Sequence, residues 1–234
     1  MSKTGPVQAE LAGKAEEVFW GLWASIFYAP PTPPRAVVVC STNHREGASL
    51  VAGALAVAGA STAAGPAAIA GEENLAAPAS GVLLVDFNLR TPGLHKLFDL
   101  DRSPGLSEVL LGKTDLASAV KHVGPGDLDV LTSGAEPESL LQLLKTDRMR
   151  SFFDDIRQRY AYVVVDAPPA NPYPDAQVLA SLVGTVVLVA QSQRTSREAL
   201  LQARRRMELG SARVAGVVLN KRTYPIPKFV YKRV

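Results

Sequence analysis

Short, continuously apolar runs rich in β-branched residues recur along this chain, and they constrain its fold more than any other feature. Runs that are apolar throughout, rather than alternating with polar residues, are typical of strands that helices cover on both faces. We therefore predict a sheet buried between two helical layers, with strands at residues 36–40, 82–86, 128–131, 162–166, 185–190 and 214–219.

The segments between these runs carry apolar residues at helical spacing. In residues 149–159, Phe152, Phe153 and Ile156 fall on one side of a predicted helix. Residues 196–209 likewise put an apolar side opposite a charged one. Strand and helix in alternation predict an α/β fold with a doubly wound, mostly parallel sheet flanked by helices. A chain of 234 residues fits a single such domain.

Three segments fall outside this alternation. Residues 1–34 are predicted to form an amino-terminal helix followed by a proline-rich linker. Residues 59–81 are rich in glycine, alanine, proline and serine, and are predicted to be a flexible insertion. Residues 223–234 form a basic tail, in a segment that has no acidic residue from Lys221 onward. The α/β domain is therefore predicted to span residues 35–222.

Composition and charge exclude several classes of function. A formal net charge of +3 does not suit a nucleic-acid-binding protein. The single cysteine, Cys40, cannot form an intramolecular disulfide and is interpreted as a small core residue. The polar amino terminus lacks the apolar core of a signal peptide. The longest candidate span, residues 18–30, is shorter than the ~20 residues that a bilayer needs, so we expect a soluble, cytoplasmic protein.

Polar residues follow the carboxyl ends of four predicted strands, at the edge where parallel α/β sheets bind ligands. The first strand is followed by a loop and a predicted helix, whose first backbone N–H groups attract anions. Asp86, Asp166 and Asn220 end three of the other strands. The two carboxylates either hold Mg²⁺ through water or cap the turns that follow them. The three histidines have no metal-ligand spacing.

The ordered set of motifs resembles the bacterial tyrosine kinases of capsule and exopolysaccharide synthesis, which have a P-loop NTPase-like fold. The Glu-Gly-x-Ser sequence at residues 46–49 resembles their Walker A region. The sequence from Asp86 to Arg90 resembles their second motif, which normally reads Asp-x-Asp-x-Arg. The resemblance covers residues 16–222, and further motifs match in order at residues 104–110, 128–134, 163–169 and 215–221.

For the site, the resemblance implies ATP and Mg²⁺ as cofactors. Ser49 and Asp86 stand at positions that would hold the metal ion, and Asp86 and Asp166 would be catalytic if the chain is active. The nucleotide-binding positions of the family fall on Arg45, Gly47, Ser49 and Asn220.

Two departures from the family determine the prediction of activity. A Walker A loop needs a lysine that reaches the β and γ phosphates, and Ala48 stands at its position. Asn88 stands where the family has its second aspartate. Losing one charge-assisted contact costs ~1.5–3 kcal/mol in binding, and the transition state loses more. We therefore expect no bound cofactor; the alternative is that Arg45 supplies the missing charge, so that ATP and Mg²⁺ bind.

Both ends of the chain also depart from the family. The related kinases carry Glu-x-x-Arg-x-x-Arg in a helix that docks into a neighbouring subunit; here Glu17 is kept, and Trp20 and Trp23 replace the arginines. The tryptophans either pack on the chain's own domain or form an interface with a partner. That partner would be a cytoplasmic segment of a membrane polysaccharide co-polymerase or export protein, or another copy of the chain. Only Tyr224 and Tyr231 remain of the family's autophosphorylated tyrosine cluster.

These features predict a non-catalytic, pseudokinase-like component or regulator of a membrane complex that polymerises or exports exopolysaccharide. A partner would recruit it to the inner face of the cell membrane. The alternative is a weak or partner-activated ATPase or tyrosine autokinase of the same pathway, with an atypical Walker A loop. A spatial-positioning ATPase of the same P-loop class fits less well, because the run at residues 104–110 favours the polysaccharide branch.

Overall fold

The computed structural model describes residues 14–61, 80–124, 126–137, 143 and 147–222. Among these residues, seven strands form one sheet in the order β3-β4-β2-β5-β1-β6-β7. All neighbouring strands are parallel except β3, which pairs antiparallel with β4. The strands are β1 Ala36–Ser41, β2 Val82–Asp86, β3 Lys121–His122, β4 Leu128–Leu131, β5 Tyr162–Ala167, β6 Thr185–Gln191 and β7 Arg213–Asn220.

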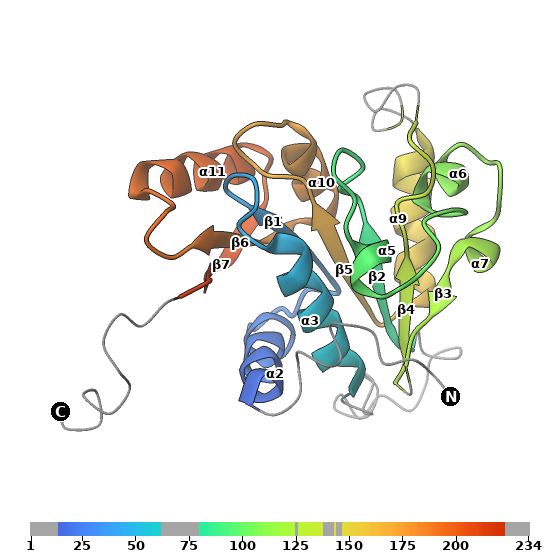
Figure 1. Cartoon of the computed structure of the whole chain (residues 1–234), viewed down its shortest axis with the longest axis horizontal. Helices are drawn as coiled ribbons and strands as arrows, with labels where there is room; N and C mark the ends of the chain where they lie inside the picture. Colours follow the sequence, from blue (N-terminus) through green and yellow to red (C-terminus); the bar gives the residue numbers. More distant parts are fainter. Residues whose placement is uncertain (1–13, 62–79, 125, 138–142, 144–146, 223–234) are drawn as a thin grey trace.

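Helices cover both faces of this sheet (Figure 1). Apolar side chains of α2, α3 and α5 join one core cluster, and those of α6, α7, α9, α10 and α11 join the other. The predicted α/β class, with a doubly wound and mostly parallel sheet, is therefore confirmed. The helices are α2 Lys14–Phe27, α3 Ala48–Ser61, α5 Leu94–Leu97, α6 Leu106–Leu110, α7 Leu116–Ala119, α9 Asp147–Arg159, α10 Asp175–Val183 and α11 Arg197–Leu209.

Each predicted strand is present, with bounds that agree to within one residue at either end. β1 illustrates why the runs are apolar throughout: Val37 and Val39 lie in one core cluster, while Val38 and Cys40 lie in the other. Cys40 is fully buried as expected, and burial raises the pKa of its thiol to about 12. The prediction missed β3, which is a two-residue edge strand too short and too polar to leave a pattern.

The predicted insertion at residues 59–81 starts too early, because α3 continues to Ser61. Gly59 is part of that helix, and a Cβ atom there would overlap with the ring of Trp23. A glycine in the helix interior is explained by this close approach of α2. Residues 62–79 of the predicted insertion and the tail at residues 223–234, with Tyr224 and Tyr231, lie outside the described residues.

The interface prediction for Trp23 is wrong, because this side chain lies in the chain's own core. Trp23 is 0% exposed, and its ring centroid lies 4.2 Å from that of Phe27 and 5.0 Å from that of Tyr162. α2 packs along α3, so the apolar face of α2 is satisfied within the domain (Figure 1). Trp20 lies on the outer side of α2 with 48% of its surface exposed, and Glu17 is exposed as well.

Candidate functional site

The carboxyl ends of β1, β2 and β5 bring most of the predicted site residues to one edge of the sheet. Asp86 and Asp166 end neighbouring parallel strands and lie opposite each other in register. Residues 42–47 connect β1 to α3, which begins at Ala48; these residues and the first two residues of α3 are here called the 42–49 loop. Asn220 reaches the same loop from the end of β7. Glu17 and Trp20 are not part of this site, since both belong to α2.

Glu46 supports the 42–49 loop from inside, a role that the sequence did not reveal. It is 3% exposed, and its Oε2 accepts hydrogen bonds from the Thr42 amide (2.9 Å), the Thr42 hydroxyl (2.6 Å) and the Asn43 amide (3.1 Å). Its Oε1 accepts a hydrogen bond from the Thr195 hydroxyl at 2.6 Å. The carboxylate thus joins the start of the loop to the segment after β6, and holds the loop in a fixed shape.

The 42–49 loop also presents unused backbone donors. Among the described residues, no backbone N–H group from His44 to Ser49 donates a hydrogen bond. Gly47 has φ +95°, and a Cβ atom at this position would overlap with the Asn220 amide. A run of free N–H groups at the start of a helix attracts an anion, so the loop keeps the backbone part of a phosphate cradle.

The end of β7 closes over the outer side of this loop. The Asn220 Nδ2 donates a hydrogen bond to the Glu46 carbonyl at 2.9 Å, so the side chain predicted to bind nucleotide contacts the loop itself. The Lys221 ammonium donates a hydrogen bond to the Arg45 carbonyl. The contact of Lys221 with the loop could not be predicted from sequence, because nothing in its neighbourhood along the chain points to the loop.

Among the described residues, no arginine or lysine side chain is held in place at the position of the Walker A lysine. Arg45, the predicted substitute, is exposed with φ +63°, and its guanidinium forms no hydrogen bond or ion pair with any described residue. Arg90 is held elsewhere: it bonds Asp175 through two nitrogens at 2.6 and 3.3 Å. Its guanidinium also lies 4.2 Å above the ring centre of Tyr173.

Asp86 is largely occupied with structural hydrogen bonds. Its carboxylate accepts hydrogen bonds from the Asn88 amide at 3.1 Å and from the Gly93 and Leu94 amides at 3.2 Å each. The last two bonds cap the start of α5. Burial raises the pKa of Asp86 to about 6, and the three N–H groups partly offset this rise because they favour the charged form.

Asp166 is different, because its carboxylate is fully buried and neither oxygen has a hydrogen-bond partner among the described residues. Burial and the neighbouring Asp86 charge raise its pKa well above the ordinary value, and the nearby Ser49 hydroxyl lowers it in part. A buried, unpartnered carboxylate beside a second one and a serine hydroxyl fits a hydrated Mg²⁺ ion. Such an ion would neutralise phosphate charge. No group of three or more metal-ligating His, Cys, Asp or Glu side chains occurs among the described residues.

Asn88, the second departure from the family, has a structural role in the turn after β2. It is 8% exposed, and its Oδ1 accepts hydrogen bonds from the Thr91 amide at 3.3 Å and from the Thr91 hydroxyl at 3.1 Å. An amide oxygen makes these turn contacts as well as a carboxylate oxygen does. The change to asparagine therefore removes charge from the site without removing the turn.

The unpartnered carboxylate gives a stability prediction for Asp166→Asn. The folded-state pKa of Asp166 is raised above the ordinary value of about 3.9, so the folded protein holds this proton more tightly than the unfolded chain does. Stability is therefore unaffected by Asp166 below about pH 3.9 and is lost as pH rises from there through the folded-state pKa. At about pH 7 the variant should therefore gain roughly 1–3 kcal/mol in free energy of unfolding. Urea unfolding at about pH 7 and about pH 4 checks this, because the gain should shrink at the lower pH.

The control for this prediction is Asp154→Asn on α9, where the carboxylate is 70% exposed. We expect its free energy of unfolding to equal that of the unchanged protein at both pH values. A loss of stability in Asp166→Asn at about pH 7 would contradict the assignment of an unpartnered buried carboxyl group.

Comparison with known proteins shows that the chain is similar to bacterial tyrosine-protein kinases. The chain is 31% identical over 186 residues to the tyrosine-protein kinase YwqD of Bacillus subtilis, an alignment that covers 80% of this chain and 72% of YwqD. It is 32% identical over 146 residues to the CapB protein of Staphylococcus aureus, covering 62% of this chain and 63% of CapB. With the tyrosine-protein kinase etk of Escherichia coli it shares 36% identity over 139 residues, which are 59% of this chain and 19% of that protein.

Solved structures agree with these sequence relatives. The chimerical protein CapA2B2 has a TM-score of 0.80 at 28% identity, covering 96% of this chain and 92% of that one. The kinase domain of the Escherichia coli tyrosine kinase ETK has a TM-score of 0.78 at 30% identity, covering 97% and 85%. MinD in its complex with MinC from Aquifex aeolicus shares the fold alone, with a TM-score of 0.58 at 18% identity. No protein-family model matches the sequence.

None of the helices among the described residues has the length and apolar character needed to span a membrane.

Proposed function

The chain belongs to the family of bacterial tyrosine-protein kinases, and from this membership together with Ala48 we propose that it is a non-catalytic component or regulator of a membrane complex that polymerises or exports exopolysaccharide. It would keep the fold and the loop of the family for assembly, with phosphotransfer given up. ATP and Mg²⁺ would not be required for its role.

Ala48 is the observation that carries this proposal. It is the first residue of α3, from which a Walker A lysine would reach the β and γ phosphates. In phosphoryl transfer, catalysis is mostly positioning and charge stabilisation, so a methyl group at this position removes a principal contribution. Two of the described cations around the loop are engaged with other groups: Lys221 bonds the Arg45 carbonyl, and Arg90 bonds Asp175.

The altered amino-terminal helix supports a role in assembly. Trp20 and Val18 expose 48% and 68% of their surfaces on α2, beside the exposed Glu17. Exposed aromatic area on a helix is typical of a protein interface. We propose that this side of α2 contacts a cytoplasmic segment of a membrane polysaccharide co-polymerase or export protein, or a second copy of the chain. Such a contact would recruit the protein to the inner face of the membrane.

A second candidate function is a weak or partner-activated ATPase or tyrosine autokinase. Two observations favour it: the unpartnered carboxylate of Asp166 beside Asp86, and the free N–H groups between His44 and Ser49. Ser49, Asp86 and Asp166 would hold Mg²⁺, and the N–H groups would bind phosphate oxygens. Arg45, or a cation supplied by a partner as arginine fingers are in other P-loop enzymes, would then take the place of the lysine.

The two candidate functions predict different levels of polysaccharide export when both carboxylates of the site are replaced. The source strain, with its own copy of the gene deleted, would receive the Asp86→Asn/Asp166→Asn variant, and surface and secreted polysaccharide would be measured. A non-catalytic component should restore export to the level of the unchanged gene, because neither carboxylate is used. If export stays at the level of the deletion strain while the variant accumulates normally, the protein acts as an enzyme and the proposal fails.

A further inference from the structure

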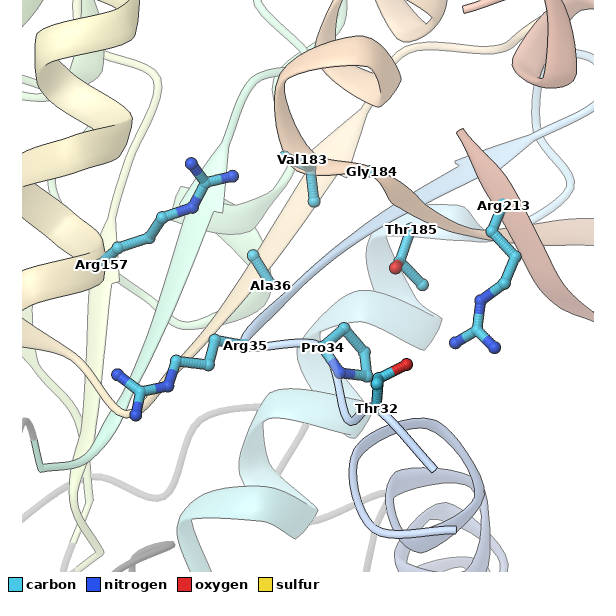
Figure 2. A pocket seen from close by; sticks show the side chains of 9 residues that line it. All are labelled: Thr32, Pro34, Arg35, Ala36, Arg157, Val183, Gly184, Thr185 and Arg213. Atoms are coloured by element: carbon cyan, nitrogen blue, oxygen red, sulfur yellow. The ribbon is translucent and has the colours of Figure 1, made fainter. Parts of the chain in front are cut away.

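A pocket of about 310 Å³ lies at the amino-terminal edges of β1, β6 and β7. This edge is opposite the 42–49 loop, which lies at the carboxyl end of β1. Three arginines line it, and Figure 2 shows them on three different sides of the pocket. They are Arg35, Arg157 and Arg213.

Each arginine comes from a different element of the fold. Arg35 immediately precedes β1, after the proline-rich linker, and Arg213 is the first residue of β7. The Arg213 backbone N–H donates a hydrogen bond to the Gly184 carbonyl at 2.9 Å, so its position at the pocket is held by main chain. Arg157 projects from α9, and its Nη2 donates a hydrogen bond to the Leu182 carbonyl at 2.7 Å.

The positive charge of this pocket is not neutralised within the domain. None of the residues lining it is acidic, and neither Arg35 nor Arg213 forms a salt bridge with any described residue. Arg157 pairs with Asp154 at 4.0 Å, and the Asp154 side chain is 70% exposed. An exposed pair at this distance contributes little, because water screens it. The hydroxyls of Thr32 and Thr185 add uncharged donors to the lining.

We propose that this pocket binds a small ligand that carries two or more separated anionic groups, with the chemistry of a diphosphate. Arginine is suited to such a ligand because its planar fork binds phosphate oxygens through two parallel hydrogen bonds. Figure 2 shows the three guanidinium groups well apart instead of meeting at one point, so a ligand with two anionic centres reaches more of them than a single phosphate does. A volume of about 310 Å³ suits a small molecule.

This site is separate from the loop at residues 42–49 and does not depend on whether that loop binds a nucleotide. A ligand in the pocket would contact the linker through Pro34, the sheet through Arg213 and α9 through Arg157. It would therefore tie the amino-terminal linker to the domain. A ligand with the chemistry of a diphosphate could be either a soluble ester or the head group of a lipid. We assign the pocket to the soluble ester.

Calorimetric titration of the whole chain with inorganic pyrophosphate tests the proposal. We expect saturable binding to one site that weakens as salt is added. Arg35→Gln and Arg213→Gln should each weaken it about tenfold or more, since each removes a charge-assisted contact. Both side chains are exposed, so the fold should survive the changes. The control is Arg205→Gln, which removes an equally exposed charge from α11 and should leave binding unchanged.

Three results would overturn the proposal. The first is that pyrophosphate does not bind. The second is that Arg35→Gln and Arg213→Gln bind pyrophosphate as tightly as the unchanged protein does, which would mean that the ligand binds elsewhere, as at the 42–49 loop. An equal loss in Arg205→Gln would instead attribute binding to net charge. A separate arm uses vesicles of phosphatidylcholine with a minority of cardiolipin, whose head group carries two phosphates. Binding to these vesicles that needs Arg35 and Arg213, without binding of pyrophosphate, would identify a membrane surface and exclude the soluble ligand.

Discussion

Restoring the two lost residues in Ala48→Lys/Asn88→Asp is expected to tighten binding of ATP with Mg²⁺ by roughly 10- to 100-fold over the unchanged protein. A single charge-assisted contact is worth ~1.5–3 kcal/mol, and the new lysine would start from the helix position next to the free N–H groups of the loop. The aspartate at position 88 would return a negative charge to the turn, which the Asn88 side chain already stabilises through its hydrogen bond from Thr91. Calorimetric titration with ATP and Mg²⁺ measures the affinity of the variant, and the absence of saturation in the unchanged protein sets a lower limit for the difference.

The matched control for this gain is Ala48→Met, which adds similar volume at the same position without the charge. We expect Ala48→Met to bind ATP no better than the unchanged protein, because the missing contribution is electrostatic. Equal affinities for the lysine and methionine variants would mean that the lysine position is not what limits binding. The account of Ala48 would then be wrong.

Replacing Trp23 by alanine is expected to lower the free energy of unfolding by about 3–5 kcal/mol. The side chain is 0% exposed and fills the space between α2, Gly59 of α3 and the rings of Phe27 and Tyr162. Removing the indole leaves a cavity that these neighbours cannot close. A loss of this size is a large part of the 5–15 kcal/mol that stabilises a typical domain, and urea unfolding measures it directly.

Two other variants separate packing from interface effects. Trp20→Ala should change the free energy of unfolding by no more than about 0.5 kcal/mol, because Trp20 is 48% exposed. Trp23→Phe should cost less than Trp23→Ala, since the indole N–H has no hydrogen-bond partner among the described residues and only volume is lost. If Trp23→Ala leaves stability unchanged and alters only self-association, Trp23 belongs to an interface, and its assignment to the core is wrong.

The sheet was predictable from sequence because burial on both faces leaves a signal in each strand separately. The run at residues 82–86, for example, is buried at every position, and no other element needed to be known to recognise it. β3 has no such signal, because Lys121 and His122 lie at the polar edge of the sheet. Trp23 shows the limit for helices: an apolar face is visible in sequence, but what covers it is decided by the packing of α3.

The site was predictable where it follows from strand ends, and not where it depends on pairs distant in sequence. Asp86 and Asp166 could be expected to meet because parallel strands end at one edge. The difference in hydrogen bonding between the two carboxylates could not be predicted, since it comes from the N–H groups of Gly93 and Leu94, which bond only Asp86. Glu46 bonds a threonine 149 positions away, and Arg90 bonds an aspartate 85 positions away. Such contacts are set by topology and leave no local pattern.

The most direct test of the central claim is a calorimetric titration of the unchanged protein with ATP and Mg²⁺, followed by mass spectrometry of Tyr224 and Tyr231 in the tail. With Ala48 in place of the lysine, we predict no saturable binding up to on the order of 1 mM nucleotide and no phosphate on either tyrosine. Micromolar binding together with phosphorylation of the tail would contradict the account, and would make this chain an active kinase with an atypical loop.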